Sequence, residues 1–516
     1  MNPVILSIDC GTQSLRTLLF SSTGELLDRV QIPYEPYYSV RPGWTEQDPE
    51  VFWKSFLSAC RQLGKNSPDL FKKITGIGVT TQRASMINVD SHGKPLRPAI
   101  IWLDQRKANE DIRFGSFIKP VLKLIGLEKT ISKLYTDGKC NWIRQNQPEI
   151  WAKTHKYLQV SGFLNFRLTG EFKDSAASQI GHIPFNYKKM RWCNPFEPAS
   201  LIFPIEKEKL PETVMPGELI GMITEKVSRQ TGLKEGIPVI ACGSDKGCET
   251  IGMGVLDTRM ASLSFGTTAT VQTTTKKYFE PISFMPPYPA PIPGYFNPEI
   301  EIFRGYWMIT WFKNEFAHKE VTKAEQNGTI PEVELDNLLK QSPPGSMGLI
   351  VQPYWGPGLD HPDGKGAMIG FGDVHTKAHV YRAVIEGLGY ALLDGLHRIE
   401  KKGKIKFTKV SVSGGASQSD EICQISADIF NLPLVRGKTT ETSGLGAAIV
   451  TASGAGIHAS IEEAMGKMVH YDTEFKPDPA NVELYAKLYK KVYQKVYKSL
   501  RPLYRNIRDI TGYPEK

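Results

Sequence analysis

The sequence predicts an α/β protein built from two domains, and three observations support this fold class. Strand-like apolar segments alternate with helical patterns along the chain. In each half, one apolar segment runs into a glycine–threonine turn, first at Gly11-Thr12 and again at Gly266-Thr267. The 516 residues also exceed what one hydrophobic core usually supports. Because the strand–turn–strand pattern starts again after an acidic loop, we expect domains at 1–246 and 247–516.

The first half reads as a sheet with helices packed on it. The opening apolar run is typical of a buried strand, and a turn at Ser22–Gly24 joins the next two strands as an antiparallel pair. Asp48-Pro49 marks a helix start, because proline is favourable at the first helical position. The expected elements are strands at 3–9, 16–21, 25–32, 74–81 and 238–242 and a helix at 51–63.

The second half repeats the pattern with additions. A strand at 409–413 enters the glycine turn Gly414–Ser417, and helices are expected at 419–430 and after Gly444. The proline-rich segment 280–300 reads as an irregular insertion. From 482 to 504 an apolar stripe with lysines opposite predicts an amphipathic helix. Such a helix can bind anionic lipid, but docking on its own domain is the commoner arrangement and the one we expect.

Composition excludes several classes of protein. The content of 41% hydrophobic and 23% charged residues is ordinary for a folded chain, and the net charge of +9 comes from scattered basic residues, so nucleic-acid binding gains no support. The seven cysteines contain no CxxC pair, which favours a reducing compartment. Since no signal segment and no apolar run of ~20 residues occurs, we expect a cytoplasmic protein without a membrane partner.

The chemistry has to come from strand-end acids and glycine turns, because common catalytic motifs are missing. The chain lacks GxxxxGK[ST], a complete GxGxxG, HExxH and GxSxG. Asp245 follows an apolar strand among small residues and suits a general base for phosphoryl transfer, although an acid there can also simply cap the next helix. Asp9 would hold Mg²⁺ beside a polyphosphate, and otherwise it is only a strand-end acid.

Two further segments are suggestive but ambiguous. Arg83 ends a strand in the same half as Asp245 and could donate a fork of hydrogen bonds to substrate hydroxyls. Gly414–Ser417 would let a flat group approach the backbone. Exposed arginines are common, and tight strand–helix turns use the same small residues, so neither segment identifies a site by itself.

Taken in order, these motifs resemble the FGGY family of carbohydrate kinases almost from end to end. Asp9–Ser14 looks like the family's first phosphate motif, and Gly43–Pro49 matches its G-W-x-E-x-D-P stretch. Lys139–Ile143 resembles the K-x-x-W core of the first family signature, and Gly370–Glu386 resembles the second, with Phe371 departing from an aliphatic position. Gly414–Ser417 falls where the family binds adenosine.

The resemblance implies two actin-like (ribonuclease H-like) domains with the active site in the cleft between them, and ATP and Mg²⁺ as cofactors. Asp245 would be the catalytic base and would lie near Mg²⁺ together with Asp9. The residues implied for ATP are Gly11, Thr12, Gln13, Gly266 and Thr267 at the phosphates and Gly414, Gly415, Ala416 and Ser419 at the adenosine. Those implied for the acceptor are Gln82, Arg83, Asp104, Tyr135 and Asp245.

The sequence narrows the identity of the phosphoryl acceptor only in part. Ala84 stands where glycerol kinases of the family carry a glutamate, and losing that hydrogen-bond acceptor would cost ~1–3 kcal/mol, so glycerol is disfavoured. The Met-His usual in xylulokinases is also missing here. Three residues suggest a ketose or polyol larger than glycerol: Arg83, the small Ala84, and Asp104 from a W-x-D-x-R segment. We prefer a pentulose such as xylulose over glycerol, other polyols and aldonates.

Two rival functions stay open. An actin-like ATPase would share the two phosphate turns but would lack the Trp44–Pro49 stretch and the Lys139/Trp142 core. A sugar-binding relative without catalysis would not need Asp9, Asp245 and both turns. The resemblance also suggests a homodimer, because relatives often form one, although no residue pattern marks an interface.

Overall fold

The computed structural model describes residues 3–110, 128–283, 285–356 and 361–513, which form two compact units. Unit 1 consists of 1–254, 288–296 and 441–469, and unit 2 of 255–287, 297–440 and 470–516. The units are therefore not consecutive halves of the chain, as the boundary at residue 246 would make them. Two segments from the second half, a short hairpin and a helical segment, return to unit 1.

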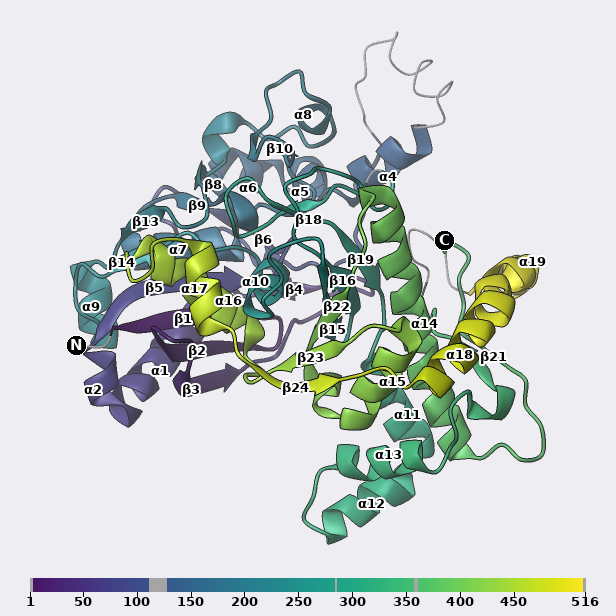
Figure 1. Ribbon diagram of the computed structural model, residues 1–516. Helices are drawn as coiled ribbons and strands as arrows, with labels where there is room; N and C mark the ends of the chain where they lie inside the picture. Colours follow the sequence, from purple (N-terminus) through teal and green to yellow (C-terminus); the bar gives the residue numbers. More distant parts are fainter. Residues whose placement is uncertain (1–2, 111–127, 284, 357–360, 514–516) are drawn as a thin grey trace. The chain divides into compact units, whose positions relative to one another are not determined.

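Unit 1 is organised around a six-stranded sheet of mixed direction (Figure 1). In chain order, the first three strands form an antiparallel meander, and the fourth and the last strand run parallel to the first. All seven residues of the first strand are buried, which explains its unbroken apolar run. The strands, in spatial order, are β13 (Leu219–Met222), β14 (Pro238–Ile240), β5 (Ile74–Thr81), β1 (Val4–Cys10), β2 (Ser14–Ser21) and β3 (Leu26–Pro33).

Unit 2 repeats this sheet nearly strand for strand. Its first three strands form an antiparallel meander, and two parallel strands follow on the other side of the first. The two sheets differ only at the edge strand beside the second parallel strand. In unit 2 this edge strand, β24, comes after its neighbour β23 in the sequence, whereas in unit 1 the edge strand β13 comes before its neighbour β14. The strands, in spatial order, are β19 (Glu299–Ile302), β16 (Ala269–Gln272), β15 (Met260–Phe265), β22 (Lys409–Ser413), β23 (Leu434–Gly437) and β24 (Tyr471–Phe475).

The faces of the unit 1 sheet are covered by different helices. One face packs against α1 (Pro49–Asn66) and α7 (Val160–Thr169), which share a hydrophobic core with it. The other packs against α16 (Thr442–Gly454), where Gly78 of β5 leaves room: a Cβ there would lie 2.1 Å from the Thr451 hydroxyl. Beside it lies α10 (Asp245–Gly252), in contact with α16.

The remaining elements of unit 1 surround this framework. Asp48 caps α1 by accepting a hydrogen bond from the Glu50 N–H at 3.0 Å, as the Asp-Pro start predicted. A four-stranded sheet, β4-β7-β6-β8, forms a second layer. The remaining elements are α2 (Pro68–Phe71), β4 (Glu46–Gln47), β6 (Met86–Val89), β7 (Ala99–Ile100), α4 (Glu128–Asp137), α5 (Lys139–Asn146), α6 (Pro148–Lys153), β8 (Lys156–Gln159), β9 (Lys173–Ser175), β10 (Phe185–Asn186), β11 (Arg191–Trp192), α8 (Pro198–Ile202), β12 (Glu212–Val214), α9 (Glu225–Thr231) and α17 (Ile461–Met468).

Unit 2 is built around the long helix α14 (Lys377–Gly403), most of which is buried in the core of this unit. Ser419 caps the neighbouring helix α15, as the expected helix at 419–430 requires. The other elements of unit 2 are α11 (Trp307–Phe316), α12 (His318–Gln326), α13 (Pro331–Lys340), β20 (Ile350–Gln352), β21 (Ala367–Ile369), α15 (Asp420–Phe430) and α18 (Pro479–Leu488). The strands β17 (Tyr288–Pro289) and β18 (Phe296–Asn297) form the hairpin that returns to unit 1.

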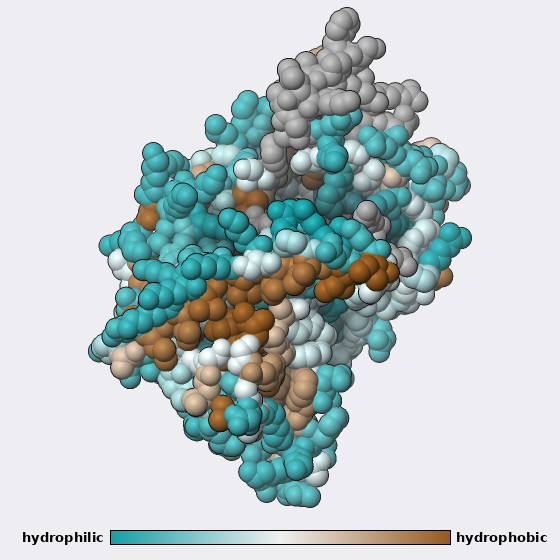
Figure 2. Space-filling model, turned by 90° about the vertical axis from the view of Figure 1, so that its right-hand side faces the viewer, coloured by the Kyte–Doolittle hydropathy of each residue, from teal (hydrophilic) through white to brown (hydrophobic). Residues whose placement is uncertain are grey.

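The chain tail is helical, as its apolar stripe predicted. After α18, a π-helical turn at Tyr489–Tyr493 leads into α19 (Gln494–Thr511). Its early residue Val496 is buried in unit 2, but apolar residues further along the helix are exposed. Figure 2 shows a band of hydrophobic side chains on the face where α19 lies. Among the described residues, every helix is too short or too polar to span a bilayer.

Candidate functional site

The predicted residues of the first half gather at one edge of the unit 1 sheet. The parallel strands β1, β5 and β14 all end there, and a bridge pairs Thr81, the last residue of β5, with Ser244 beyond the end of β14. The first phosphate turn, Gln82-Arg83 and Asp245 directly follow these strand ends. Ligand sites of open α/β sheets occur at this carboxyl edge.

The first turn is held rigidly by hydrogen bonds from three sides. The Gly11 N–H donates to the Ser14 carbonyl at 3.0 Å, and the Tyr34 hydroxyl donates to the Gly11 carbonyl at 2.6 Å. The Thr12 hydroxyl accepts a hydrogen bond from the Trp102 indole at 3.0 Å. Gln13 is exposed. The turn is thus preorganised, with Gly11 and Thr12 partly open to a ligand.

The Gln82 side chain supports the first phosphate turn through hydrogen bonds and does not simply point toward an acceptor. Its amide donates to the Gly11 carbonyl at 3.4 Å, and its side-chain oxygen accepts from Thr12 at 3.4 Å and from Ser85 at 3.2 Å. The Ser85 hydroxyl also accepts from the Trp102 N–H at 3.3 Å. Trp102 therefore belongs to this site, although only the neighbouring Asp104 was predicted; its place in the W-x-D-x-R segment was the available signal.

Asp9 lies on the sheet face that α16 covers, in an ion-pair network that reaches across the sequence. Arg16 stands opposite Asp9 in the β1–β2 register and approaches it to 3.5 Å. Arg16 also contacts Glu441 at 3.2 Å, and Glu441 binds Arg29 at 2.7 Å. Burial raises the pKa of Asp9 to about 7, opposed by Arg16 and increased further by Asp245. No sequence pattern linked Glu441 to this network.

Asp245 is the first residue of α10 and keeps partial solvent access. Ser244 caps the helix by accepting from the Gly247 N–H at 3.3 Å, which leaves the Asp245 carboxylate to accept from the Lys246 N–H at 2.7 Å. Burial raises the pKa of Asp245, while the positive charges of Arg83 and Lys246 oppose the increase. Lys246 in turn forms an ion pair with Glu249 at 2.7 Å.

The charges around Asp9 and Asp245 suit a divalent cation. Desolvation raises the pKa of both carboxyls, and the charge of Asp245 adds to the raised pKa of Asp9. A cation between such groups would relieve both penalties. The described residues hold no cluster of three or more metal-ligating side chains. A cation would therefore need water and phosphate as additional ligands, which is how Mg²⁺ is usually held.

Arg83 is oriented by an aromatic ring from the returning hairpin. Its guanidinium lies 5.1 Å from the ring centroid of Tyr288, and its charge acts on Asp245. The next residue, Ala84, has a φ of 56°, in the left-handed region. This geometry turns the chain sharply after Arg83. Tyr288 was not predicted, because the segment 280–300 reads as an irregular insertion.

Asp104 is fully enclosed, in contrast to its predicted contact with an acceptor. Its side chain is 0% exposed and pairs with Arg106 at 2.7 Å, with Lys139 at 3.5 Å and with the Thr45 N–H at 2.7 Å. A sugar hydroxyl would have to displace one of these donors. The geometry therefore gives Asp104 a positioning role.

The same network joins the three motifs around Asp104. Arg106 lies 4.1 Å from the Trp44 ring centroid and 4.7 Å from that of Trp142, and it pairs with Glu46 at 2.8 Å. Tyr135, which precedes Lys139 in the sequence, has a buried side chain. Its carbonyl accepts a hydrogen bond from the Asn141 side chain at 2.9 Å. The motifs thus build a rigid support for the loop that carries Trp102.

In unit 2 the second turn and the glycine loop follow adjacent parallel strands. Ser264 of β15 pairs with Ser413 of β22, so Gly266 and Gly414 emerge side by side. Gly414 has a φ of +87°, and a Cβ there would lie 2.7 Å from the Phe265 backbone. Gly415 is open, since a Cβ there would contact nothing within 4 Å. The predicted Thr267 is also exposed.

Ala416 and Ser419 complete the predicted adenosine residues. Ala416 is partly buried beside Gly415. The Ser419 hydroxyl caps α15 by accepting from the Ile422 N–H at 3.2 Å and donates to Asp336 at 2.5 Å. This hydroxyl is therefore committed to the protein, and the open surface of the loop is its glycine backbone.

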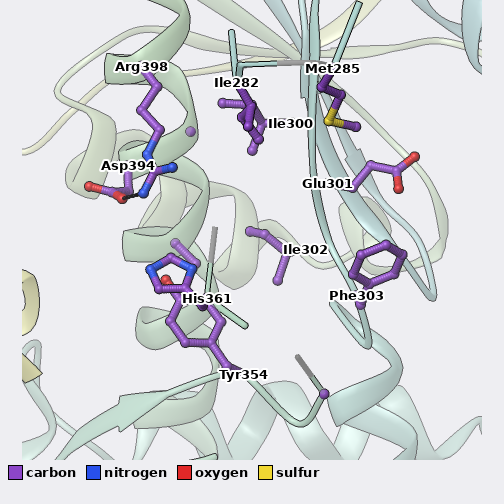
Figure 3. Close-up of a pocket in the computed structure, with 13 residues that line it drawn as sticks. Ile282, Met285, Ile300, Glu301, Ile302, Phe303, Tyr354, His361, Asp394 and Arg398 are labelled. Atoms are coloured by element: carbon purple, nitrogen blue, oxygen red, sulfur yellow. Dashed lines mark hydrogen bonds and ion pairs between the residues drawn. The ribbon is translucent and has the colours of Figure 1, made fainter. Parts of the chain in front are cut away.

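A separate cavity in unit 2 contains none of these residues. Figure 3 shows Asp394 and Arg398 of α14 on one side and Ile300 and Ile302 of β19 on the other. The Tyr354 and His361 rings stack nearby with centroids 4.2 Å apart. The volume is about 60 Å³, room for a few ordered waters and too little for a sugar.

Comparison with known proteins identifies the family. Two models match, the N-terminal domain of the FGGY family of carbohydrate kinases over residues 4–252 and its C-terminal domain over 261–455. The chain belongs to this family. It is a carbohydrate kinase, and the predicted α/β fold class with two actin-like domains is confirmed.

Individual FGGY relatives are similar along nearly their whole length. A xylulose kinase from Lactococcus lactis is 28% identical over 490 residues, covering 93% of this chain and 94% of its own. The structure of a gluconate kinase from Lactobacillus acidophilus superposes with a TM-score of 0.82 at 23% identity, covering 98% and 100%. A xylulose kinase structure from the same organism gives 0.80 at 23% identity, covering 99% of each chain. At these identities the two structures establish the fold alone.

Proposed function

We propose that this kinase transfers the γ-phosphoryl group of ATP to a hydroxyl of a neutral ketose, a pentulose such as xylulose. The observation that carries the proposal is Asp245, a partly accessible carboxylate at the start of α10, beside Arg83 and within reach of the charge of Asp9. A general base for phosphoryl transfer needs access to the acceptor and a positively charged neighbour that keeps it ionised. Asp245 has both.

Asp245 would take the proton from the attacking hydroxyl as the bond to phosphorus forms. Burial raises its pKa, which makes the carboxylate a stronger base, and the positive charges of Arg83 and Lys246 oppose part of this increase. Arg83 would donate hydrogen bonds to the acceptor, with its plane fixed on Tyr288.

Asp9 and Asp245 would hold Mg²⁺ when it is bound with ATP, Asp9 through water. The cation would neutralise charge on the phosphates, and Arg16 would limit the net charge on Asp9. The backbone and hydroxyl of Gly11 and Thr12 would face the phosphates from unit 1. Gly266 and Thr267 would also contact the phosphates, and the open backbone of Gly414–Ala416 would carry the adenosine.

A neutral acceptor fits the charges better than an aldonate. Arg16 and Arg29 are paired with Glu441, and Lys246 is paired with Glu249. Arg83 is offset by Asp245. Among these four described cations, an acceptor carboxylate would therefore find none that is not already offset by a carboxylate, and it would add to the negative charge of ATP. Relatives that are named xylulose kinase support a five-carbon ketose.

The test is a coupled ADP-release assay with Mg²⁺ and a panel of pentuloses, hexuloses, aldonates and polyols. We expect turnover with a pentulose at a kcat/KM at least tenfold above that with gluconate or glycerol. An aldonate preference would contradict the charge argument. ADP release that is the same with and without every acceptor would replace the proposal by the actin-like ATPase.

A further inference from the structure

The hairpin Tyr288–Phe296 is firmly seated in unit 1, although its flanking residues belong to unit 2. The Ala290 N–H donates to the Tyr295 carbonyl at 2.9 Å, and the Tyr295 N–H donates to the Ile292 carbonyl at 3.1 Å. Ala290 and Ile292 are buried. The proline-rich segment is therefore a fixed part of unit 1 rather than a loose insertion.

The hairpin contacts both sides of the proposed base. Pro291 lies against Gly243 and Gly247, where an added Cβ would come within 2.9 Å and 3.1 Å of its ring. These glycines flank Ser244-Asp245. Larger residues at 243 or 247 would push the hairpin away, which gives a physical reason for the small residues around Asp245.

At the other end of the hairpin, Tyr288 forms an aromatic surface next to Arg83. The guanidinium lies over its ring at 5.1 Å, and the Tyr187 ring meets it edge-on at 5.8 Å. Tyr187 is itself fixed, because its hydroxyl lies 3.1 Å from both the N–H and the carbonyl oxygen of Gly181. Gly181 in turn packs against Ala84, because a Cβ added to Gly181 would lie 3.1 Å from the Ala84 Cβ.

We propose that Tyr288 determines the acceptor length that this kinase accepts, an inference that rests on the proposed function. When acceptor hydroxyls are bonded to Asp245 and Arg83, the carbons beyond them lie against the Tyr288 and Tyr187 rings. A three-carbon acceptor has no carbons left to contact these rings. A five-carbon ketose gains apolar contact there, so the hairpin favours longer acceptors without adding a charge.

The test compares acceptors of three, four and five carbons: dihydroxyacetone, erythrulose and xylulose. We expect Tyr288→Ala to lower kcat/KM for xylulose about 10–100-fold and that for dihydroxyacetone no more than about 3-fold, mainly through KM. Tyr288→Phe keeps the ring and should retain the length preference. Tyr295→Phe, in the same hairpin, is the matched control and should change neither acceptor.

An equal loss at all three lengths would overturn the proposal, because it would mean that Tyr288 only holds Arg83. If Tyr288→Ala does not fold, Tyr288→Asn makes the same comparison, because it removes the apolar ring and leaves a polar side chain in its place. Wild-type enzyme that phosphorylates only aldonates would refute the proposed substrate class instead, so the two failures are distinguishable.

Discussion

The two sheets place different chemistry at equivalent positions. Asp9 stands two residues before Gly11 at the end of β1, and Ser264 stands two residues before Gly266 at the end of β15. The fourth strand of one sheet leads into Gln82–Ala84, and the matching strand of the other leads into Gly414–Ala416. Unit 1 therefore presents charged and polar side chains where unit 2 presents hydroxyl and bare backbone.

The helices that follow β14 and β23, the outer parallel strands of the two sheets, extend the comparison. After β14, α10 begins with Asp245, which keeps solvent access. After β23, α16 is preceded by Glu441, which is buried and bound by Arg16 and Arg29. One acid is left available and the other is used to hold the structure together. A repeated scaffold therefore does not repeat its function, because the strand ends fix only where the residues stand.

The largest effect should come from the acid that is left available. Asp245→Asn keeps the shape but cannot accept a proton, so we expect kcat to fall on the order of 10³-fold with the Kd for ATP unchanged. Glu441→Gln, at the equivalent place of the repeat, should mainly lower stability and keep substantial turnover. Full activity in Asp245→Asn, measured by ADP release with a pentulose, would remove the base assignment.

The next effect tests whether unit 2 works through backbone. Gly414→Ala places a Cβ 2.7 Å from the Phe265 backbone at a φ of +87°, so we expect a lower Tm and an ATP KM raised about tenfold. Gly415→Ala meets no protein atom within 4 Å. It should leave Tm unchanged and still raise the Kd for ATP several-fold, as isothermal titration with ATP can measure. Unchanged ATP affinity in Gly415→Ala would place the adenosine elsewhere.

A smaller effect, on the pH dependence of the stability, should distinguish Asp9 from Ser264, its counterpart in unit 2. The folded pKa of Asp9, about 7, lies above its ordinary value of 3.8, so its protonation stabilises the fold below pH 3.8 and this contribution is lost as pH rises through 7. Without divalent cations, Asp9→Asn should be more stable than wild type at pH 8 by on the order of 1 kcal/mol, and not at pH 4.

Guanidinium unfolding at both pH values measures the difference, and Ser264→Ala is the control, which should show the same change at each pH. Equal destabilisation by Asp9→Asn at pH 4 and pH 8 would contradict the argument. Activity of Asp9→Asn should be low, so the gain in stability would come with a loss of function.

The smallest effect concerns the indole that holds the first turn. Trp102→Phe removes the hydrogen bond to Thr12 while keeping a ring, so we expect the ATP KM to rise about 2–5-fold, corresponding to roughly 0.5–1 kcal/mol. Unit 2 offers no such test, since its turn is supported by the Phe265–Tyr306 stack at 4.5 Å. A larger loss of kcat than of KM would mean that Trp102 acts on chemistry as well.

Much of the fold was predictable because local signals are strong. Continuous apolar runs gave β1 and β5, and Asp48-Pro49 gave the start of α1. The returning segments were not predictable, since membership of a unit depends on long-range packing. The helix after residue 441 was expected in the second domain, yet α16 packs on β1 and β5.

The candidate site shows the same limit. Spacing and resemblance singled out Asp9, Asp245 and Arg83, which do gather at one sheet edge. Resemblance also suggested Asp104 for the acceptor, but its oxygens are taken by Arg106 and Lys139. Tyr288 has no local signal, because its contact with Arg83 spans 200 residues of sequence and depends on where a hairpin returns.

Unit 1 is assembled from separate stretches of the chain, and this affects how it folds during synthesis on the ribosome. Its first stretch ends at residue 254, but α16, which covers one sheet face, is complete only after residue 454. At 5–20 residues per second, that face waits roughly 10–40 s for its cover. Nascent chains should therefore engage chaperones during this interval, and slowing translation between the two stretches should lower the soluble yield.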